Sequence, residues 1–418
     1  MNRPLLAVVV FASLLAKAQP AARDVDLTAA DGTKLKASFY AARTTAKAAP
    51  AVMLLHMCNT DRQSWSWVAE QLSAAGISAL TMDNRGFGES GGPRVEEAPP
   101  QVQQQVAEKW PGDFDIAFHW LLSQPKVDQS RIGAAGGSCG VNNAVKLASR
   151  HPEIHTLVLL AGSTDRAGIN YLLQNAWIPL FTAAAADDEY DSQSPSLMQW
   201  FTELTGNPRN KFVGFENGHH GTEIFGMHPE LPKQIVAFYV DTLQKNPASA
   251  TAKVIAKKTA ASEFWDAANQ AGGAERATQI FREARKSYLK AVVCPEEILN
   301  ALGYARLQAA GMPTGGANSL APSSSATSSP QEIAQAKADG LQLLKLNAEV
   351  HPNSANAQDS LADAYVVNGQ NGEALAAEQK CLDLLPNDNS IGYEFKVQLR
   401  QTAEQKLAKM KSSSGSGR

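Results

Sequence analysis

The chain has 418 residues, of which 44% are hydrophobic and 19% charged, and its formal net charge is −3. This length and composition suit two or three ordinary globular domains. A net charge so close to zero gives no sign of the basic surface that nucleic-acid-binding proteins present, so a nucleic-acid partner is not expected. The four cysteines are too few and too scattered to form a disulfide-stapled scaffold.

Residues 1–18 have the pattern of a secretory signal peptide. Arg3 supplies a positive charge, residues 5–15 are apolar, and Ala16-Lys17-Ala18 places small residues at the cleavage spacing. The apolar stretch is shorter than the roughly 20 residues that a membrane-spanning helix needs, and no later stretch approaches that length. The sequence therefore predicts an exported protein, periplasmic or secreted, that does not span a membrane.

From residue 24 to residue 246, short apolar runs alternate with amphipathic stretches. Strands are expected at 24–28, 34–40, 51–57, 77–82, 132–135, 156–160, 178–183 and 211–215, and helices at 64–75, 113–122, from 138 onward and at 232–244. Asp31-Gly32 indicates a hairpin between the first two strands. Later strands are joined through helices by short connections, which is typical of a parallel sheet. The predicted fold is α/β, with a mixed, mostly parallel sheet flanked by helices.

Beyond residue 246 the sequence becomes rich in Ala, Glu and Lys, with hardly any strand signal. We expect a second, all-helical domain over residues 262–410. Residues 312–330 interrupt it with Gly, Ser, Ala, Thr and Pro, a composition typical of a flexible loop.

Part of this domain has the spacing of a tetratricopeptide repeat. Leu361, Tyr365, Ala374 and Pro386 match that repeat, and Pro352 precedes Pro386 by one 34-residue period. Two repeats are fewer than a solenoid usually needs for stability. The helical domain is therefore expected to pack on the first domain or on another chain.

The stretch Gly136-Gly137-Ser138-Cys139-Gly140 has the form of a nucleophile elbow. It follows the apolar strand candidate at 132–135 and precedes an amphipathic helix. Glycine two residues before and two residues after the serine allows strand and helix to pass close together, so that the serine hydroxyl is exposed on a strained turn. A bare motif of this kind arises by accident in roughly one chain in seven of this length. Its context favours Ser138 as a catalytic nucleophile.

A serine hydroxyl needs a neighbouring base, and that base needs an orienting carboxylate. Three carboxylates, Asp187, Asp188 and Asp191, follow the strand candidate at 178–183. We favour Asp188, because the acid usually stands three residues after a small residue at the strand's exit, here Ala185. Asp187 is the close competitor and Asp191 a distant one. The other interpretation is that these acids only cap the following helix.

The stretch Gly218-His219-His220-Gly221 follows the last strand candidate and supplies the base. We favour His220, which stands directly before a loop that enters a helix, whereas His219 suits a surface position or a supporting role. A metal site built on the two histidines is disfavoured, because no carboxylate or cysteine lies nearby at ligand spacing. We therefore expect no metal and no cofactor. The order Ser, acid, His is the one that accompanies this elbow.

The reaction also needs two backbone N–H donors for the developing oxyanion. One is expected from Cys139, directly after the nucleophile, and the other from Met57 or Cys58, after the strand candidate at 51–57. Cys58 and Cys139 would then flank the same small hole, either as a disulfide or as two buried free thiols. Cys139 is a poorer nucleophile candidate than Ser138, because the residue two positions after it is not glycine.

These motifs resemble the α/β-hydrolase superfamily, and specifically its dienelactone-hydrolase-like and esterase branch. The resemblance covers residues 24–246 and rests on Leu54-Leu55-His56-Met57, residues 82–90, residues 131–140 and His220-Gly221-Thr222. The second stretch is similar to the family's Asp-x-Arg-Gly-x-Gly-x-Ser segment, a loop that shapes the backbone at the rim of the site. The resemblance implies the same nucleophile, acid and base as above.

The chain departs from the family pattern in three ways. Met57 stands where the family often has glycine, which implies a narrowed or reshaped oxyanion loop. Dienelactone hydrolases proper use cysteine where this chain has Ser138. Only a short segment separates the sixth and seventh strands, where many relatives insert a lid, so the site is expected to be open unless residues 91–112 or the helical domain cover it.

Two functions follow from this sequence. The leading one is an exported serine hydrolase that cleaves a small-molecule carboxylic ester, or else an amide, through an acyl-enzyme on Ser138. The alternative is a binding or assembly protein in which the hydrolase domain is catalytically silent and the tetratricopeptide-like region holds a protein partner or a second copy of the chain.

Overall fold

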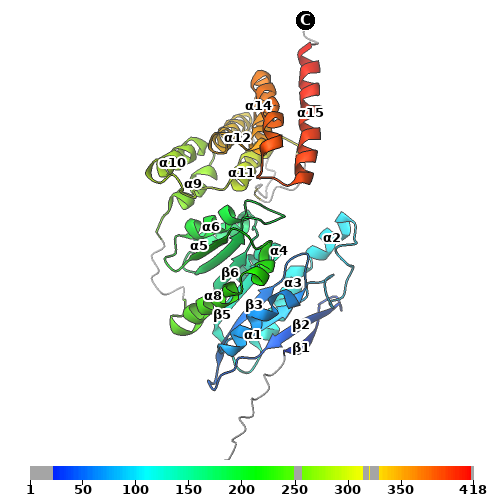
Figure 1. Cartoon of the computed structure of the whole chain (residues 1–418), viewed down its shortest axis with the longest axis vertical. Helices are drawn as coiled ribbons and strands as arrows, with labels where there is room; N and C mark the ends of the chain where they lie inside the picture. The colour runs from blue at the N-terminus through cyan, green and yellow to red at the C-terminus, as the bar shows by residue number, and fades with distance from the viewer. Residues whose placement is uncertain (1–21, 249–256, 314–319, 321–328, 416–418) are drawn as a thin grey trace, which may run out of the picture.

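The computed structural model describes residues 22–248, 257–313, 320 and 329–415. The predicted signal peptide at 1–18 lies outside the described residues, as does most of the predicted loop at 312–330. Figure 1 shows an α/β domain with a region of helices stacked above it.

The sheet has eight strands in the order β1-β2-β4-β3-β5-β6-β7-β8. The strands are β1 (Arg23–Thr28), β2 (Lys34–Tyr40), β3 (Ala49–Leu55), β4 (Ser78–Met82), β5 (Val127–Gly137), β6 (Ile154–Leu160), β7 (Leu180–Ala185) and β8 (Lys211–Phe215). β1 and β2 pair antiparallel, as do β2 and β4, and every later pairing is parallel. This confirms the predicted mixed, mostly parallel sheet.

Helices cover both faces of the sheet. They are α1 (Ser66–Ala74), α2 (Pro100–Ala107), α3 (Trp110–Leu122), α4 (Cys139–Arg150), α5 (Arg166–Gln174), α6 (Ser194–Thr205), α7 (Ile224–Met227) and α8 (Glu230–Tyr239). β3 and β4 are buried along their whole length, which explains their nearly continuous apolar sequences. One apolar core joins the sheet to α3, α4, α5 and α6, and a second joins its other face to α1 and α8.

Three helical segments differ from the sequence prediction. α2 and α5 were not expected; both are short, and α2 carries few apolar residues, whereas α5 buries Ile169 and Leu172. The helix predicted at 232–244 ends as an α-helix at Tyr239 and continues as a π-helix over Val240–Lys245.

The C-terminal region is all helical, as predicted. Its helices are α9 (Ala260–Ala268), α10 (Ala274–Ser287), α11 (Glu296–Ala309), α12 (Pro330–Val350), α13 (Ala355–Val367), α14 (Asn371–Leu384) and α15 (Tyr393–Gly415). Consecutive helices pack in pairs, α11 on α12 and α13 on α14. That these pairs are tetratricopeptide repeats stays a prediction. In the part of the chain that the structure describes, no helix is both long and apolar enough to cross a membrane.

The helical region packs directly on the α/β domain. Phe201 of α6 and Phe264 of α9 belong to the same buried apolar core. The Trp200 indole donates a hydrogen bond to the carbonyl of Val293 at 3.0 Å, and the Trp265 indole donates one to Asn170 of α5, also at 3.0 Å. Of the two packing alternatives, the structure therefore shows the first.

A buried ionic cluster joins α13, α14 and α15. Lys406 Nζ lies 2.8 Å from carboxylate oxygens of both Asp359 and Asp363. Glu378 and Cys381 are fully buried beside them, and the ligand atoms of Asp359, Glu378 and Cys381 lie within 4.8 Å of one another. These three side chains are close enough together to share a metal ion. The ammonium group of Lys406, however, already balances the charge of Asp359, so the structure does not require a metal there.

The cluster makes stability depend on pH. Burial and the charge of Asp359 raise the pKa of Glu378 from 4.5 to about 9. Between these values the folded state keeps a proton that the unfolded chain has lost, so stability falls as pH rises. We predict that urea unfolding followed by far-UV circular dichroism shows a less stable helical region at pH 9 than at pH 5.

The variant Glu378→Gln cannot ionise, so its stability should depend less on pH than that of the wild-type protein. Glu404→Gln, at an exposed position of α15, should keep the wild-type slope. An unchanged slope in Glu378→Gln would contradict the prediction.

Candidate functional site

Ser138 lies on the sharp turn between β5 and α4, as the motif predicted. Its backbone angles are φ 54° and ψ −126°, a conformation that costs free energy for any residue with a side chain. The Ser138 amide donates a hydrogen bond of 2.9 Å to the carbonyl of Leu160 on β6. This bond ties the strained turn to the neighbouring strand.

Steric contact explains the two glycines that frame the serine. A Cβ at Gly136 would overlap the carbonyl of Gly140, and a Cβ at Gly140 would lie 2.6 Å from the carbonyl oxygen of Leu55. Neither position accepts a larger residue without moving the backbone. The structure therefore places Ser138 on a crossing of strand and helix that only these glycines permit.

His220 and Asp188 form a buried, hydrogen-bonded pair. His220 Nδ1 lies 2.9 and 2.8 Å from the two carboxylate oxygens of Asp188, and the residues are 6% and 5% exposed. Burial raises the pKa of Asp188, but the hydrogen bond and charge of His220 and the amide of Asp191 outweigh burial and leave this pKa below its usual value. The carboxylate stays ionised and orients the imidazole.

The competing residues make other contacts. Asp187 accepts a hydrogen bond of 3.0 Å from the backbone amide of His219, whose side chain is 54% exposed. Asp191 accepts a bond from the amide of Gln193 at the start of α6. Of the three candidate carboxylates, Asp188 is the one in contact with the His220 ring.

The side chain of Met57 brings the loops of Ser138 and His220 together. Met57 is fully buried, and its sulfur accepts a hydrogen bond of 3.3 Å from the amide of Thr222. A Cβ at Gly137, directly before the serine, would lie 3.2 Å from Met57 Cγ and 3.5 Å from Thr222 Cγ2. Met57 therefore fills the space where the elbow, the oxyanion loop and the histidine loop meet.

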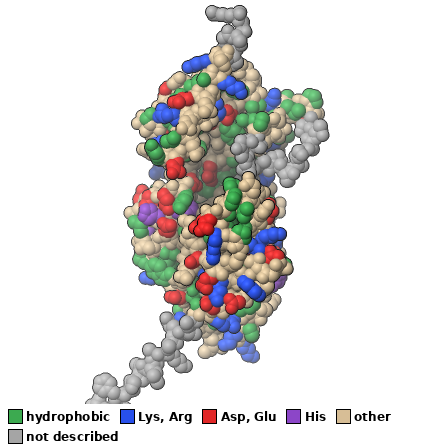
Figure 2. All heavy atoms as spheres, turned by 90° about the vertical axis from the view of Figure 1, so that its right-hand side faces the viewer, with side chains coloured by type: hydrophobic (Ala, Val, Ile, Leu, Met, Phe, Trp, Pro, Cys, Tyr) green, Lys and Arg blue, Asp and Glu red, His purple; other side chains and the backbone are tan. Residues whose placement is uncertain are grey.

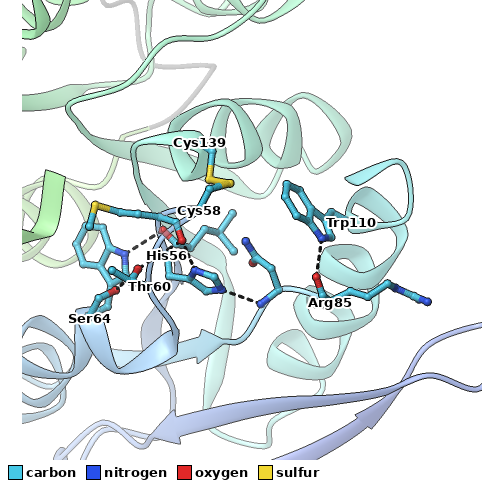
Figure 3. The surroundings of a disulfide bond; sticks show 11 residues. His56, Cys58, Thr60, Ser64, Arg85, Trp110 and Cys139 are labelled. Atoms are coloured by element: carbon cyan, nitrogen blue, oxygen red, sulfur yellow. Dashed lines mark hydrogen bonds between the residues drawn. A yellow bond between two sulfur atoms is a disulfide. The ribbon is translucent and has the colours of Figure 1, made fainter. Parts of the chain in front are cut away.

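Cys58 and Cys139 form a disulfide, which settles the alternative that the sequence left open (Figure 3). Their Cα atoms lie 5.8 Å apart. The amides of Met57, Cys58 and Cys139 meet no hydrogen-bond acceptor among the described residues. Cys139 is also the first residue of α4, whose N-terminal dipole favours negative charge. The disulfide thus links the two loops that carry the candidate oxyanion donors.

The side chain of His56 holds the loop after β3 in place through two hydrogen bonds, a role that the sequence analysis did not assign (Figure 3). Its Nε2 accepts a bond of 2.8 Å from the amide of Asn84, and its Nδ1 donates to the carbonyl of Met57. Burial lowers the pKa of His56, so the ring is neutral and can donate at one nitrogen and accept at the other. The sequence feature that could have identified His56 is its place directly after the buried strand β3.

The rim loop at residues 83–90 is held by buried ion pairs. Asp83 accepts hydrogen bonds from the backbone amides of Arg62 at 2.7 Å and of Glu89 at 2.8 Å. Arg85 contacts both carboxylate oxygens of Asp113 at 2.8 Å. Gly88 has a φ of 47°, and a Cβ there would overlap the Asp83 carboxylate. These contacts give the loop the backbone-shaping role that the resemblance implied.

Tyr190 is a site residue that sequence reasoning missed. Its ring packs on His220 with the two ring centroids 4.8 Å apart, and its hydroxyl accepts a hydrogen bond of 3.4 Å from Asn59. The residue is nevertheless 65% exposed. Tyr190 therefore forms a boundary between the candidate base and the space outside.

The strand order, the elbow and the buried Asp188–His220 pair are those of the α/β-hydrolase fold, as the sequence resemblance implied. Residues 113–221 match the family model described as "BAAT / Acyl-CoA thioester hydrolase C terminal". That segment contains the elbow, the acid loop and the histidine.

Curated relatives resemble part of the chain. An uncharacterized protein of Mycobacterium tuberculosis is 33% identical over 161 residues, which are 38% of this chain and 52% of that protein. Thiohydrolase aneE of Aspergillus aculeatus is 28% identical over 212 residues, covering 49% of this chain and 62% of that one. The chain thus spans about half the length of the first relative and less than two thirds of the second.

Among solved structures, the Pyrococcus furiosus esterase Pf2001 is similar to the α/β part. The match covers 53% of this chain and 92% of that one, with 21% identity and a TM-score of 0.40.

The disulfide leads to a stability prediction. It closes a loop of 81 residues, for which chain entropy gives a stabilisation of up to about 4 kcal/mol. We expect the double variant Cys58→Ser/Cys139→Ser to unfold at lower urea concentration than the wild-type protein. Cys294→Ser, at a buried free cysteine, measures the cost of replacing a buried thiol. An unchanged midpoint in the double variant would refute the prediction.

Proposed function

We propose that this protein is a serine hydrolase that cleaves a carboxylic ester through an acyl-enzyme on Ser138. The observation that carries the proposal is the buried Asp188–His220 hydrogen bond beside a strained serine elbow whose two loops meet on Met57. In the proposed roles, Ser138 is the nucleophile, His220 the general base and then acid, and Asp188 the group that orients the imidazole.

The proposed reaction has two halves. The Ser138 hydroxyl gives its proton to Nε2 of His220 while its oxygen attacks the ester carbonyl carbon, and the tetrahedral intermediate collapses as His220 protonates the departing alcohol. A water molecule then gives its proton to His220 and attacks the acyl-enzyme, which releases the carboxylic acid and restores the serine.

The oxyanion of both intermediates would be held by backbone amides. Cys139 supplies one, and Cys58 or Met57 supplies the other, with the N-terminus of α4 adding a favourable dipole. Removing one such donor typically costs a factor of ~100 to ~1,000 in kcat. The Cys58–Cys139 disulfide fixes the separation of the two loops that carry these amides. We therefore expect it to support the rate of hydrolysis as well as the stability of the fold.

A thioester is the second substrate class, because the same steps cleave it with a thiol as the leaving group. The description of the matching family model and the name of the fungal thiohydrolase favour it. An amide is disfavoured, because its leaving amine is the poorest of the three. Ester and thioester substrates with the same acyl group distinguish these classes directly.

We also propose that the protein is exported to the periplasm or secreted. The signal-peptide pattern of residues 1–18 supports this, and so does the disulfide, because disulfides persist mainly in oxidising compartments.

The test is labelling of the purified protein with a fluorophosphonate probe, with the adduct located by peptide mass spectrometry. We expect a label on Ser138 in the wild-type protein and none after heat denaturation or in Ser138→Ala. Ser138→Ala and His220→Ala should lower kcat for p-nitrophenyl acetate by a factor of ~1,000 or more, since members of a triad act as a unit.

Ser149→Ala is the matched control, because Ser149 is an exposed serine at the other end of α4. It should keep both label and turnover. A folded wild-type protein with neither label nor turnover would refute the proposal and favour the binding function of the helical region.

A further inference from the structure

A cavity of about 740 Å³ lies between a loop of the α/β domain and the C-terminal part of the helical region. One wall is the loop after β7, residues 188–193. The other wall is formed by residues 389–392 and the first turns of α15. The Ser192 hydroxyl donates a hydrogen bond to the carbonyl of Ser390 and so joins the two walls. Figure 2 shows the molecule hollowed between its two parts, with acidic side chains around the hollow.

The cavity borders the candidate catalytic pair. Asp188 lines it, and so does Tyr190, whose ring lies against His220. Clefts at domain boundaries beside reactive groups are the usual place for a small ligand. A ligand held in this cavity would therefore lie close to the loop that carries Asp188 and to the ring that packs on His220.

The walls of the cavity carry negative charge. Glu189, Asp191 and Glu394 line it in addition to Asp188, whose buried carboxylate is bonded to His220, whereas neither lysine nor arginine is among its described lining residues. A polar cavity of about 430 Å³ shares Asn389 and Ser390 with it and adds two more acids. These are Glu296 and Asp388; His351, also in that wall, is neutral because burial and Arg285 lower its pKa to about 4.

Burial and neighbouring carboxylates raise the pKa of two acids at this cavity. Burial and the charge of Asp188 raise the pKa of Asp191, although the amide of Gln193 opposes them. Behind this wall, burial and the charges of Asp191 and Glu296 raise the pKa of Glu297 to about 8. A cation in the cavity would relieve this repulsion, and the gain would appear as binding free energy.

Aromatic rings stand among these acids. Tyr190, Tyr393 and Phe395 all line the cavity, and they are 65%, 81% and 43% exposed. The face of an aromatic ring attracts an ammonium group, above all a quaternary one that keeps little hydration. Acids combined with exposed rings are the chemistry that selects a cation over a neutral group of the same shape.

We propose that this cleft binds a cationic group, and that the substrate is an ester or thioester carrying an ammonium or quaternary ammonium group. The inference rests on the proposed function of Ser138, because the cleft is linked to that site through Tyr190, which packs on His220. It disfavours coenzyme A thioesters, whose phosphates would meet the acidic residues Glu189, Asp191 and Glu394. Hydrolysis consumes one water and yields an acid and an alcohol or thiol, with the positive charge unchanged.

The first test compares acetylthiocholine with its neutral isostere 3,3-dimethylbutyl thioacetate. We expect kcat/KM to favour the cationic thioester about tenfold or more and the preference to shrink as salt is added. The double variant Glu189→Gln/Glu394→Gln should bring the ratio close to one. Glu404→Gln, on the same helix as Glu394 but outside the cleft, should keep the wild-type ratio.

The second test measures binding without turnover. Choline and its neutral isostere 3,3-dimethyl-1-butanol are titrated calorimetrically into Ser138→Ala protein. We expect choline to bind, the isostere to bind at least about tenfold more weakly, and the two glutamine substitutions together to abolish the difference.

The outcomes separate the two proposals. Choline binding in a protein that hydrolyses no ester would leave the cleft standing and remove the serine hydrolase. Equal hydrolysis of both thioesters with no choline binding would leave the hydrolase standing and overturn the cationic cleft. Choline binding with equal hydrolysis would overturn the assignment of a cationic substrate.

Discussion

The site depends on one steric constraint, the close crossing of β5 and α4 at Ser138. Gly136 and Gly140 let the two elements pass, and the serine then takes a backbone conformation that costs free energy on its own. Such a conformation persists only where its surroundings over-determine it. Here the carbonyl of Leu160 holds the Ser138 amide, and the disulfide ties the next residue to the loop after β3. The same contacts aim the candidate oxyanion donors.

The parts of this arrangement that the sequence predicted are those set by local chemistry. The elbow requires glycine at fixed positions, and an acid and a histidine must follow the ends of later parallel strands. These rules pointed to Ser138, Asp188 and His220, and the structure brings the last two into contact. Tyr190 was missed because nothing local distinguishes it, and His56 because its place directly after β3 does not reveal its partners. Their roles come from contacts with Asn59 and Asn84, on other loops of the same edge of the sheet.

The placement of the helical region could not be read from its repeat pattern. Helical periodicity predicted the secondary structure of this region. Its position depends on contacts with residues of the α/β domain, such as the hydrogen bonds of Trp200 with Val293 and of Asn170 with Trp265. The short connection between β6 and β7 suggested an open site. The exception allowed for was a covering helical domain, and the structure puts the helical region beside the loop after β7, where it forms one wall of the cleft.

Composition concealed the electrostatic character of the site, because a net charge of −3 over the whole chain averages away local fields. The acids of the two cavities lie at 188–191, 296, 388 and 394, and only folding brings them together. A cleft with walls of one sign concentrates ligands of the opposite sign and repels those of its own. The fold and the elbow fit esters and acyl-CoA thioesters equally well. Under the proposed function, the charge of the cleft would separate these substrates, since an anionic carrier would have to bring its phosphates against the carboxylates of the cleft.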